Sequence, residues 1–260
     1  MKQQAMTILI ANKVGHQFGG LCAVNDFNLK LHYGDLMGVI GPNGAGKTTL
    51  FNLITGVYKA SEGSILFKGI EIVGKKPNQI AALRIGRTFQ NIRLFRDLSV
   101  LDNVRIAHHS QTSYNVLEGL LHCGRYAREE QRIIDNSLRL LAIFNLSHLA
   151  NETAKNLPYG LQRRLEIARA LAISPELLLL DEPAAGMNPF EIDELMGLIQ
   201  SIRKEFQLTI LLIEHQMKLV MGICERIHVL DFGETLAVGS PEMIQNNPKV
   251  MEAYLGAIPS

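Results

Sequence analysis

Hydrophobic residues gather in three short runs that contain almost no polar position. The runs are Leu36–Ile40, residues 177–180 and residues 208–213. Runs of this kind are typical of strands buried on both faces of a parallel sheet, because a half-buried strand would alternate hydrophobic and polar positions. We therefore expect a parallel sheet in the interior of the protein.

The chain before and after these runs has β-prone segments of a different kind. Residues 7–13 and 27–31 lie on either side of a turn predicted at residues 18–20, and residues 65–67 form another short segment. This arrangement predicts an antiparallel flank beside the parallel sheet. Two further strands are expected later in the chain, at residues 227–230 and 235–238.

Helical periodicity dominates the middle of the chain. Between residues 100 and 149 hydrophobic residues recur at spacings near four without strand-like alternation. A helix that begins at Gly160 is expected to end before Ser174 and Pro175, since the residue before a proline disfavours helical geometry. We expect an inserted helical subdomain at about residues 91–172.

A third helical region follows the second hydrophobic run. Asn188, Pro189 and Glu191 have the residue types preferred at the N-cap, first and third positions of a helix. The apolar stripe behind them predicts a long amphipathic helix. The tail at residues 241–255 also has a helical pattern.

Composition narrows the class of protein. With 26 Lys and Arg residues against 25 Asp and Glu residues, the net charge of +1 argues against a dedicated nucleic-acid binder. The N-terminal residues do not resemble a signal peptide, and the hydrophobic runs are too short to span a bilayer. No His and Cys spacing typical of a metal site is present.

The strongest chemical signal follows the first hydrophobic run. The pattern G-x-x-x-x-G-K-[ST] is matched at every fixed position, by Gly41, Gly46, Lys47 and Thr48. The residues expected to bind the nucleotide are Gly41, Pro42, Asn43, Gly44, Ala45, Gly46, Lys47, Thr48 and, one residue beyond the pattern, Thr49. Glycines let successive backbone N–H groups point at a phosphate, and the helix that follows favours bound anions. A glycine turn with a chance lysine would give this pattern in roughly 1% of chains of this length. We infer a nucleotide site, with Lys47 on the outer phosphates and Thr48 on magnesium.

Two adjacent carboxylates end the second hydrophobic run. Asp181 and Glu182 follow residues 177–180, at the carboxyl end of the expected strand, where open parallel sheets place their ligands. The predicted fold is therefore α/β, a phosphate-loop NTPase core with an antiparallel β flank and an inserted α-helical subdomain. A basic cluster of Arg84, Arg87, Arg93 and Arg96 surrounds Gln90; such clusters are usually solvated surface.

The order and spacing of these motifs resemble the ATP-binding cassette ATPases over the whole chain. The motifs are the phosphate loop, Gln90, residues 157–162, the Asp181-Glu182 pair and His215. The resemblance implies one ATPase domain over residues 1–260 that binds ATP and Mg²⁺. Taken alone, Gln90 would more often be a surface amide and His215 a satisfied histidine at a strand end; the joint occurrence reverses that reading.

The same resemblance implies roles for individual residues. Glu182 would be the general base, His215 would contact the γ-phosphate, and Gln90 would touch the magnesium and move with the transporter. Asp181 and Thr48 would join Gln90 in holding the metal. Phe18 would stack on the adenine; the alternative is that Phe18 only packs in a turn.

One segment departs from the family pattern. The family signature Leu-Ser-Gly-Gly-Gln is represented by residues 157–161, which keep only Leu157 and Gly160. Pro158 supplies neither the hydroxyl of serine nor a backbone N–H. Leu157 and Gly160 are still expected to contact ATP across a dimer, through the N-terminus of the helix.

Several longer strings resemble one branch of the family, the cytoplasmic ATPases of bacterial high-affinity branched-chain amino acid importers. They are residues 87–95, 163–169, 182–188 and 253–256. That resemblance implies a second ATPase subunit, identical or different, membrane permease subunits, an indirect periplasmic binding protein, and a peripheral place on the cytoplasmic face of the inner membrane. An importer for urea, an amide or another amino acid remains open, as does a soluble cassette ATPase. A phosphate-loop kinase or GTPase would leave Gln90, Glu182 and His215 unexplained.

Overall fold

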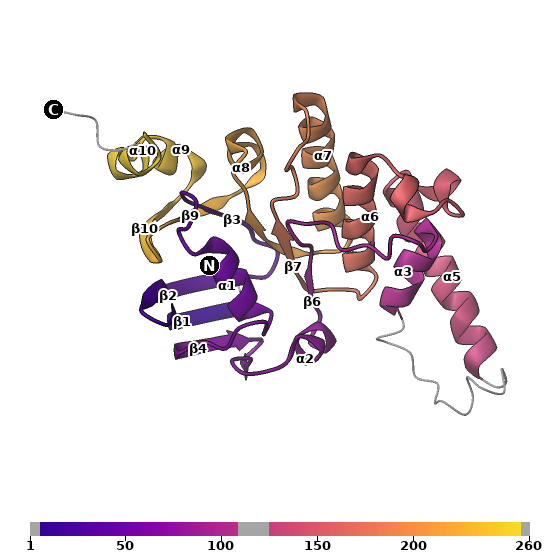
Figure 1. Cartoon of the computed structure of the whole chain (residues 1–260), viewed down its shortest axis with the longest axis horizontal. Helices are drawn as coiled ribbons and strands as arrows, with labels where there is room; N and C mark the ends of the chain where they lie inside the picture. Colours follow the sequence, from indigo (N-terminus) through magenta and orange to yellow (C-terminus); the bar gives the residue numbers. More distant parts are fainter. Residues whose placement is uncertain (1–5, 109–124, 256–260) are drawn as a thin grey trace, which may run out of the picture. The chain divides into compact units, whose positions relative to one another are not determined.

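The computed structural model describes residues 6–108 and 125–255, and these fall into two compact units. The first, here called the core unit, comprises Met1–Arg87 and Glu176–Ser260. The second, here called the helical unit, comprises Thr88–Pro175, close to the 91–172 expected from the sequence. Figure 1 shows the strands of the core unit and the helices of the helical unit.

The core unit is built on a sheet of six strands in the order β10-β9-β3-β8-β7-β6. The five strands from β9 to β6 pair in parallel, and β10 pairs antiparallel with β9 at one edge. Three strands, β3, β7 and β8, are buried at every position, which explains their lack of alternation. The bounds are β3 Leu36–Ile40, β6 Ile85–Arg87, β7 Leu177–Asp181, β8 Thr209–Ile213, β9 Arg226–Asp231 and β10 Glu234–Gly239.

A second sheet of the core unit has four antiparallel strands in the order β2-β1-β4-β5. Its strands are β1 Thr7–Phe18, β2 Leu21–His32, β4 Glu62–Phe67 and β5 Ile70–Glu71. The first two strands are longer than the sequence predicts, because they continue to a two-residue turn at Gly19 and Gly20. Lys13 and Asp26, both at positive φ, accompany shifts in the β1–β2 register, and such bulges interrupt the alternation on which the prediction depends.

Helices cover both faces of the six-stranded sheet. Helix α1 (Lys47–Ile54) shares a hydrophobic core with the antiparallel sheet, and its Leu50 and Phe51 are fully buried. Each such side chain contributes about 1.5–3 kcal/mol through burial. Figure 1 shows α7 (Pro189–Glu205) and α8 (Met217–Ile223) on the other face. The remaining helices of the core unit are α2 Pro77–Ala82, α9 Pro241–Gln245 and α10 Pro248–Leu255.

The start of α7 follows the signature read in the sequence. The Asn188 side chain accepts from the backbone N–H groups of Phe190 and Glu191, at 3.0 and 3.1 Å, and the Glu191 carboxylate accepts from the N–H of Asn188 at 2.9 Å. This reciprocal pair is a capping box, with Pro189 at the first helical position. The cap fixes where the loop after Glu182 ends.

The helical unit contains three α-helices among its described residues. They are α3 (Val100–His108), α5 (Arg125–Ile143) and α6 (Tyr159–Leu171), and the 3-10 helices η2 (Ser147–Leu149) and η3 (Ala154–Asn156) lie between α5 and α6. Part of the predicted helical stretch, residues 109–124, lies outside the described residues. Helix α6 begins at Tyr159, one residue before the start predicted from the sequence, because Pro158 serves as its N-cap.

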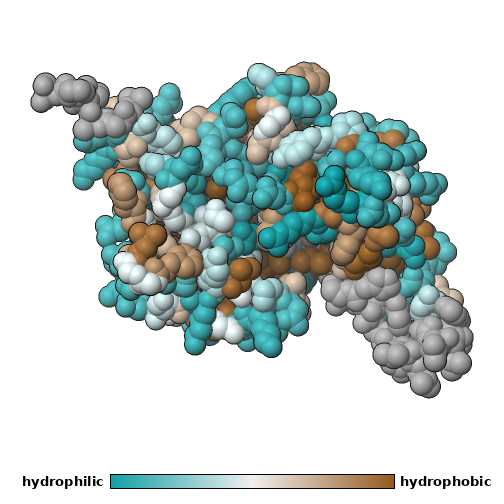
Figure 2. All heavy atoms as spheres, in the orientation of Figure 1, coloured by the Kyte–Doolittle hydropathy of each residue, from teal (hydrophilic) through white to brown (hydrophobic). Residues whose placement is uncertain are grey.

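Hydrophobic side chains on the surface are dispersed. The face shown in Figure 2 is mostly hydrophilic and is interrupted by several hydrophobic patches. Phe95, Phe190 and Phe232 are the exposed phenylalanines with the largest exposed fractions among the described residues. Within residues 6–108 and 125–255, no helix combines the length and hydrophobicity that a membrane span requires.

Candidate nucleotide site

The phosphate loop connects β3 to α1, and its shape depends on close approach of backbone to backbone. A Cβ on Gly41 would overlap the carbonyl oxygen of Leu230, and a Cβ on Gly46 would overlap that of Ala23. Both glycines have positive φ, at 153° and 97°. Only glycine fits these two positions, so the loop closes into a cradle directly before the N-terminus of α1.

Lys47 is held inside this cradle. Its Nζ donates to the carbonyl oxygens of Gly41 and Pro42, at 2.7 and 2.8 Å. Burial lowers the pKa of Lys47 from its ordinary value, and the nearby carboxylates of Glu182 and Asp181 act in the opposite direction. A desolvated ammonium group with two carbonyl partners can exchange them for the phosphate oxygens of a ligand, a stronger charge-assisted interaction.

Asp181 ends β7 beside an arginine that the sequence pattern assigned to the surface. The side chain of Arg87 is 6% exposed and its Nη2 lies 2.9 Å from Asp181 Oδ2. Arg87 Nη1 also donates to Asn52 Oδ1 and Thr55 Oγ1 at the end of α1. The interpretation of the basic cluster as solvated was therefore wrong for Arg87, because its partner is 94 positions away in the sequence.

Glu182 and His215 meet at the carboxyl ends of the neighbouring strands β7 and β8. Glu182 Oε1 lies 2.9 Å from His215 Nε2, and the side chains are 14% and 36% exposed. Glu182 has a positive φ of 47°, and its N–H donates to the carbonyl of Ile213. Strain of this kind at a non-glycine residue is typical of a functional position held by its surroundings.

Glu214 fixes the loop that carries His215, a role that sequence reasoning did not assign. Its side chain is almost fully buried, and Oε2 accepts from the N–H groups of His215 and Gln216 at 2.7 and 3.0 Å. Oε1 accepts from the N–H of Ala184, at 2.7 Å. One buried carboxylate therefore joins the loop after Glu182 to the loop that holds its histidine partner.

The C-terminal part of the chain contacts the phosphate loop twice. The N–H of Gly233 donates to the carbonyl of Ala45 at 3.2 Å. At the other end, the backbone of Gly41 hydrogen-bonds the phenol oxygen of Tyr254 on α10; burial raises the pKa of Tyr254, and this contact opposes the shift. Nothing local in the sequence indicates that a residue so distant would reach Gly41.

Phe18 lies at the end of β1 in a cluster of rings. Its ring centroid is 4.6 Å from that of His16 and 5.2 Å from that of Tyr58, with edge-to-face geometry in both pairs. The Phe18 side chain is 42% exposed. The cluster gives Phe18 a fixed orientation and leaves part of its ring accessible for stacking, as the sequence prediction for this residue requires.

The other predicted site residues belong to the helical unit. Gln90 is exposed and lies in the segment after β6, Leu157 is buried just before α6, and Gly160 is in the first turn of α6. The carbonyl of Leu157 accepts from the Gln162 side chain at 2.8 Å, which links the two ends of the signature segment. The roles assigned to these residues, and to Glu182, His215 and Phe18, stay predictions.

The donor set of the core unit fits a magnesium ion. Thr48 offers a hydroxyl at the start of α1, and Asp181 offers a carboxylate already oriented by Arg87. Magnesium prefers oxygen ligands, usually one or two protein groups together with the phosphates of a substrate. Within the described part of the chain, no group of three or more His, Cys, Asp or Glu side chains could hold a metal without such phosphates.

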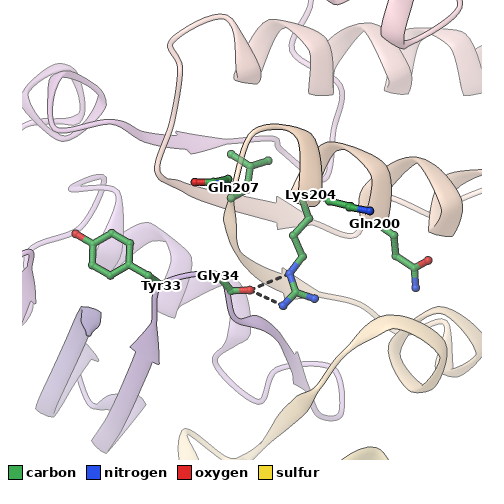
Figure 3. A pocket seen from close by; sticks show the side chains of 7 residues that line it. Tyr33, Gly34, Gln200, Lys204 and Gln207 are labelled. Carbon is green, nitrogen blue, oxygen red and sulfur yellow. Dashed lines mark hydrogen bonds between the residues drawn. The ribbon is translucent and has the colours of Figure 1, made fainter. Parts of the chain in front are cut away.

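A separate cavity of about 600 Å³ lies away from this chemistry, at the amino ends of β3 and β8. Tyr33, Gly34, Gln200, Lys204 and Gln207 contribute to its lining (Figure 3). Arg203, another lining residue, donates to the carbonyl of Gly34 and pairs with Glu225. Because parallel sheets bind ligands at the carboxyl ends of their strands, we place the nucleotide at the phosphate loop and not in this cavity.

Two family models match the chain. The model described as ABC transporter covers residues 24–185, from β2 past Glu182. The model described as branched-chain amino acid ATP-binding cassette transporter covers residues 234–257, which include Tyr254. The second match thus falls on the C-terminal segment that contacts the phosphate loop.

Whole-chain relatives agree with these matches. The chain is 48% identical to the high-affinity branched-chain amino acid transport ATP-binding protein LivG of Escherichia coli (strain K12), over 96% of this chain and 98% of LivG. It is 46% identical, at the same coverage, to BraF of Pseudomonas aeruginosa, which carries the same description. Among solved structures, the ADP conformation of MJ1267, an ATP-binding cassette of an ABC transporter, superposes with a TM-score of 0.84 at 30% identity, covering 96% and 99% of the two chains. The phosphate cradle, the paired carboxylates and these matches together place the chain in the ABC transporter family, among its branched-chain amino acid ATP-binding cassette proteins.

Proposed function

We propose that this chain is the ATP-hydrolysing subunit of an importer that takes up branched-chain amino acids through membrane permease partners. The observation that carries the proposal is the meeting of Glu182 and His215 near Lys47 of the phosphate loop, just after the neighbouring strands β7 and β8 end. A phosphate cradle alone would bind nucleotide, whereas a carboxylate oriented by a histidine can also activate water.

Each residue then has a separate task in hydrolysis. The loop N–H groups and Lys47 bind the phosphates, and Glu182 accepts hydrogen bonding from the attacking water and polarises it. His215 orients Glu182 through Nε2 and would contact the γ-phosphate of bound ATP. A magnesium ion held by Thr48 and Asp181 would neutralise phosphate charge, and Gln90 keeps the role at the ATP that the family resemblance implies.

Substitution of Glu182 separates binding from chemistry. We expect Glu182→Gln to bind ATP with wild-type affinity and to hydrolyse it about 10²- to 10⁴-fold more slowly, because only the base is removed. Lys47→Ala is the matched control, since it should lower ATP affinity about 10- to 100-fold by removing a charge-assisted contact. Nucleotide affinity and phosphate release are measured on both variants. Hydrolysis by Glu182→Gln at the wild-type rate would refute the base assignment.

The surface that receives the permease is proposed to lie on the helical unit. Phe95 is 47% exposed, and the guanidinium of Arg169 lies 5.5 Å from its ring centroid, so the ring is presented from a fixed position. Ile92 and Leu94 are half-buried nearby in sequence, and the neighbouring Arg93 and Arg96 are exposed. An apolar centre with a basic rim suits a short amphipathic helix of a membrane protein.

A charged residue at this surface should uncouple hydrolysis from transport. We expect Phe95→Glu to retain the ATPase activity of the isolated chain while permease binding, and uptake of leucine, isoleucine or valine by vesicles, fall at least about tenfold. Met243→Glu, at an exposed position of α9, is the control and should transport normally. Normal uptake by Phe95→Glu would contradict the docking proposal, whereas absence of uptake by the wild type would contradict the choice of solute.

A second ATPase subunit is proposed to complete each ATP site. Pro158 caps α6 without a side-chain hydrogen bond, so the signature contributes only the helix N-terminus and Gly160. This weak half favours pairing with a different ATPase whose signature is complete. Size measurements on Glu182→Gln with ATP, alone and with a candidate partner, test the point.

Together with the permeases this arrangement implies a peripheral location at the cytoplasmic face of the membrane, with a periplasmic binding protein acting only indirectly.

A further inference from the structure

Arg163 and Glu166 form a buried ion pair on helix α6 that takes no part in the proposed binding or hydrolysis of ATP. Arg163 Nη1 lies 2.7 Å from Glu166 Oε2, and the two side chains are 0% and 2% exposed. Burial raises the pKa of Glu166, while Arg163 and two backbone N–H groups oppose the rise. A charge pair this deep is costly to desolvate, so its remaining hydrogen bonds determine whether it is tolerated.

Four of those hydrogen bonds go to the segment that carries Gln90. The guanidinium of Arg163 donates to the carbonyl of Phe89 at 2.6 Å and to that of Gln90 at 2.8 Å. Glu166 Oε1 accepts from the N–H of Phe89 at 3.3 Å and from that of Arg93 at 3.2 Å. Residues 89–93 contain no helix or strand, so this pair supplies partners that secondary structure would otherwise provide.

The same arginine also reaches the first turn of α6. Arg163 Nη2 donates to the hydroxyl of Tyr159 at 3.1 Å, next to Gly160. On the other side, Phe95 is fixed by Asn103 of α3, which exchanges hydrogen bonds with its N–H and carbonyl at 2.8 and 3.0 Å. The segment around Gln90 is therefore attached at several points to the helix that begins at the signature.

We infer that Arg163 and Glu166 are positioning residues that make the segment 89–93 and the first turn of α6 one rigid body. A displacement of Gln90 then carries Gly160 with it. This inference rests on the proposed function, in which Gln90 serves the ATP of its own subunit and Gly160 the ATP completed across the dimer. The pair would link the two ATP sites and give ATP hydrolysis positive cooperativity.

The first test measures how firmly the backbone of residues 89–93 is held by the ion pair, and it does not depend on catalysis. Hydrogen exchange is followed at the amides of Phe89 and Arg93 in the wild type and in the double variant Arg163→Met/Glu166→Leu, in which apolar side chains of similar size replace the pair. We expect exchange at both amides to be at least about tenfold faster in the double variant. Equal exchange in the two proteins would overturn the inference. The matched control is Lys155→Met/Asp97→Leu, which removes an exposed ion pair of the same unit and should leave both amides unchanged.

The second test measures the coupling between the two ATP sites of the dimer. The double variant should bind ATP with an affinity within about twofold of the wild type, since the phosphate loop is untouched, while kcat falls at least about tenfold and the Hill coefficient approaches one. Wild-type kcat and Hill coefficient in the double variant would overturn the inference. If the double variant does not fold, Arg163→Lys takes its place, because an ammonium cannot bond both carbonyls and the carboxylate in the same geometry. If the proposed function is wrong, the wild-type protein itself will not hydrolyse ATP. The hydrogen-exchange result does not depend on hydrolysis, so it tests the inference separately.

Discussion

The start of the phosphate loop (residues 41–46), here called the phosphate-loop corner, and the segment around Gln90 are held in place by opposite means. At the corner, backbone meets backbone: Gly41 lies against Leu230, Gly46 against Ala23, and the N–H of Gly233 binds the carbonyl of Ala45. Around Gln90, one buried ion pair supplies the contacts that hold the backbone. A corner built from backbone has little freedom to move, whereas a segment held by side chains can move as a body with the helix that carries them.

We expect the greatest loss of stability when a single carbon is added to the phosphate loop at Gly41. We expect Gly41→Ala to destabilise the protein by about 3 kcal/mol or more, because the new Cβ would overlap the backbone oxygen of Leu230, which cannot move aside. ATP affinity should fall at least about 100-fold. Denaturant unfolding and nucleotide titration measure the two effects.

Gly44→Ala is the matched control for that experiment. Gly44 also has a positive φ, of 82°, yet a Cβ there would meet no atom within 4 Å. Only the backbone strain of about 1–2 kcal/mol is expected. Equal losses for the two variants would show that strain, and not close backbone approach, shapes the corner.

Acid should lower the free energy of unfolding by an intermediate amount, through a buried histidine on β9. His228 on β9 is buried, with Nε2 2.8 Å from the hydroxyl of Thr235, and burial lowers its pKa from 6.5 to about 4. The unfolded chain therefore binds a proton that the folded chain excludes, and stability present above pH 6.5 is lost as the pH falls toward 4. Between pH 7.5 and pH 5 the expected loss is about 2 kcal/mol.

Comparison of variants isolates this contribution. His228→Asn should remove about 2 kcal/mol of the difference in unfolding free energy between the two pH values, measured with denaturant. Glu166 should contribute with the opposite sign, because a raised pKa favours the folded state as the pH falls. Wild-type pH dependence in His228→Asn would show that this buried histidine is not the titrating group.

We expect the least loss of stability from Tyr254, the side chain that contacts the backbone of Gly41. Tyr254→Phe removes the phenol oxygen that bonds the backbone of Gly41, and it should lower the unfolding free energy by about 1 kcal/mol. ATP affinity should fall by no more than about fivefold. Tyr33→Phe, at the opposite edge of the sheet, is the control. A loss as large as that of Gly41→Ala would mean that a side chain, and not the backbone, is the main support.

Features whose interacting residues are close in the chain could be predicted from the sequence. The phosphate loop lies within nine consecutive residues, the capping box of α7 within four, and the strand that ends at Asp181 is one hydrophobic run. In each case local sterics or hydrogen bonding leave few alternatives, so the pattern of residues is sufficient.

Which charged residues are buried became clear only from the folded protein. Arg87 finds Asp181 94 positions away, and Arg163 finds the carbonyl of Phe89 74 positions away. A charge is tolerated inside a protein when its partner is in place, and a partner so distant leaves no mark in the local pattern. The same holds for Tyr254 and Gly41, and for β1 and β2, where register shifts interrupt the alternation on which the prediction depends. The predicted phosphate loop could thus be read from the chain, but what holds Gln90 and His215 in position required the fold.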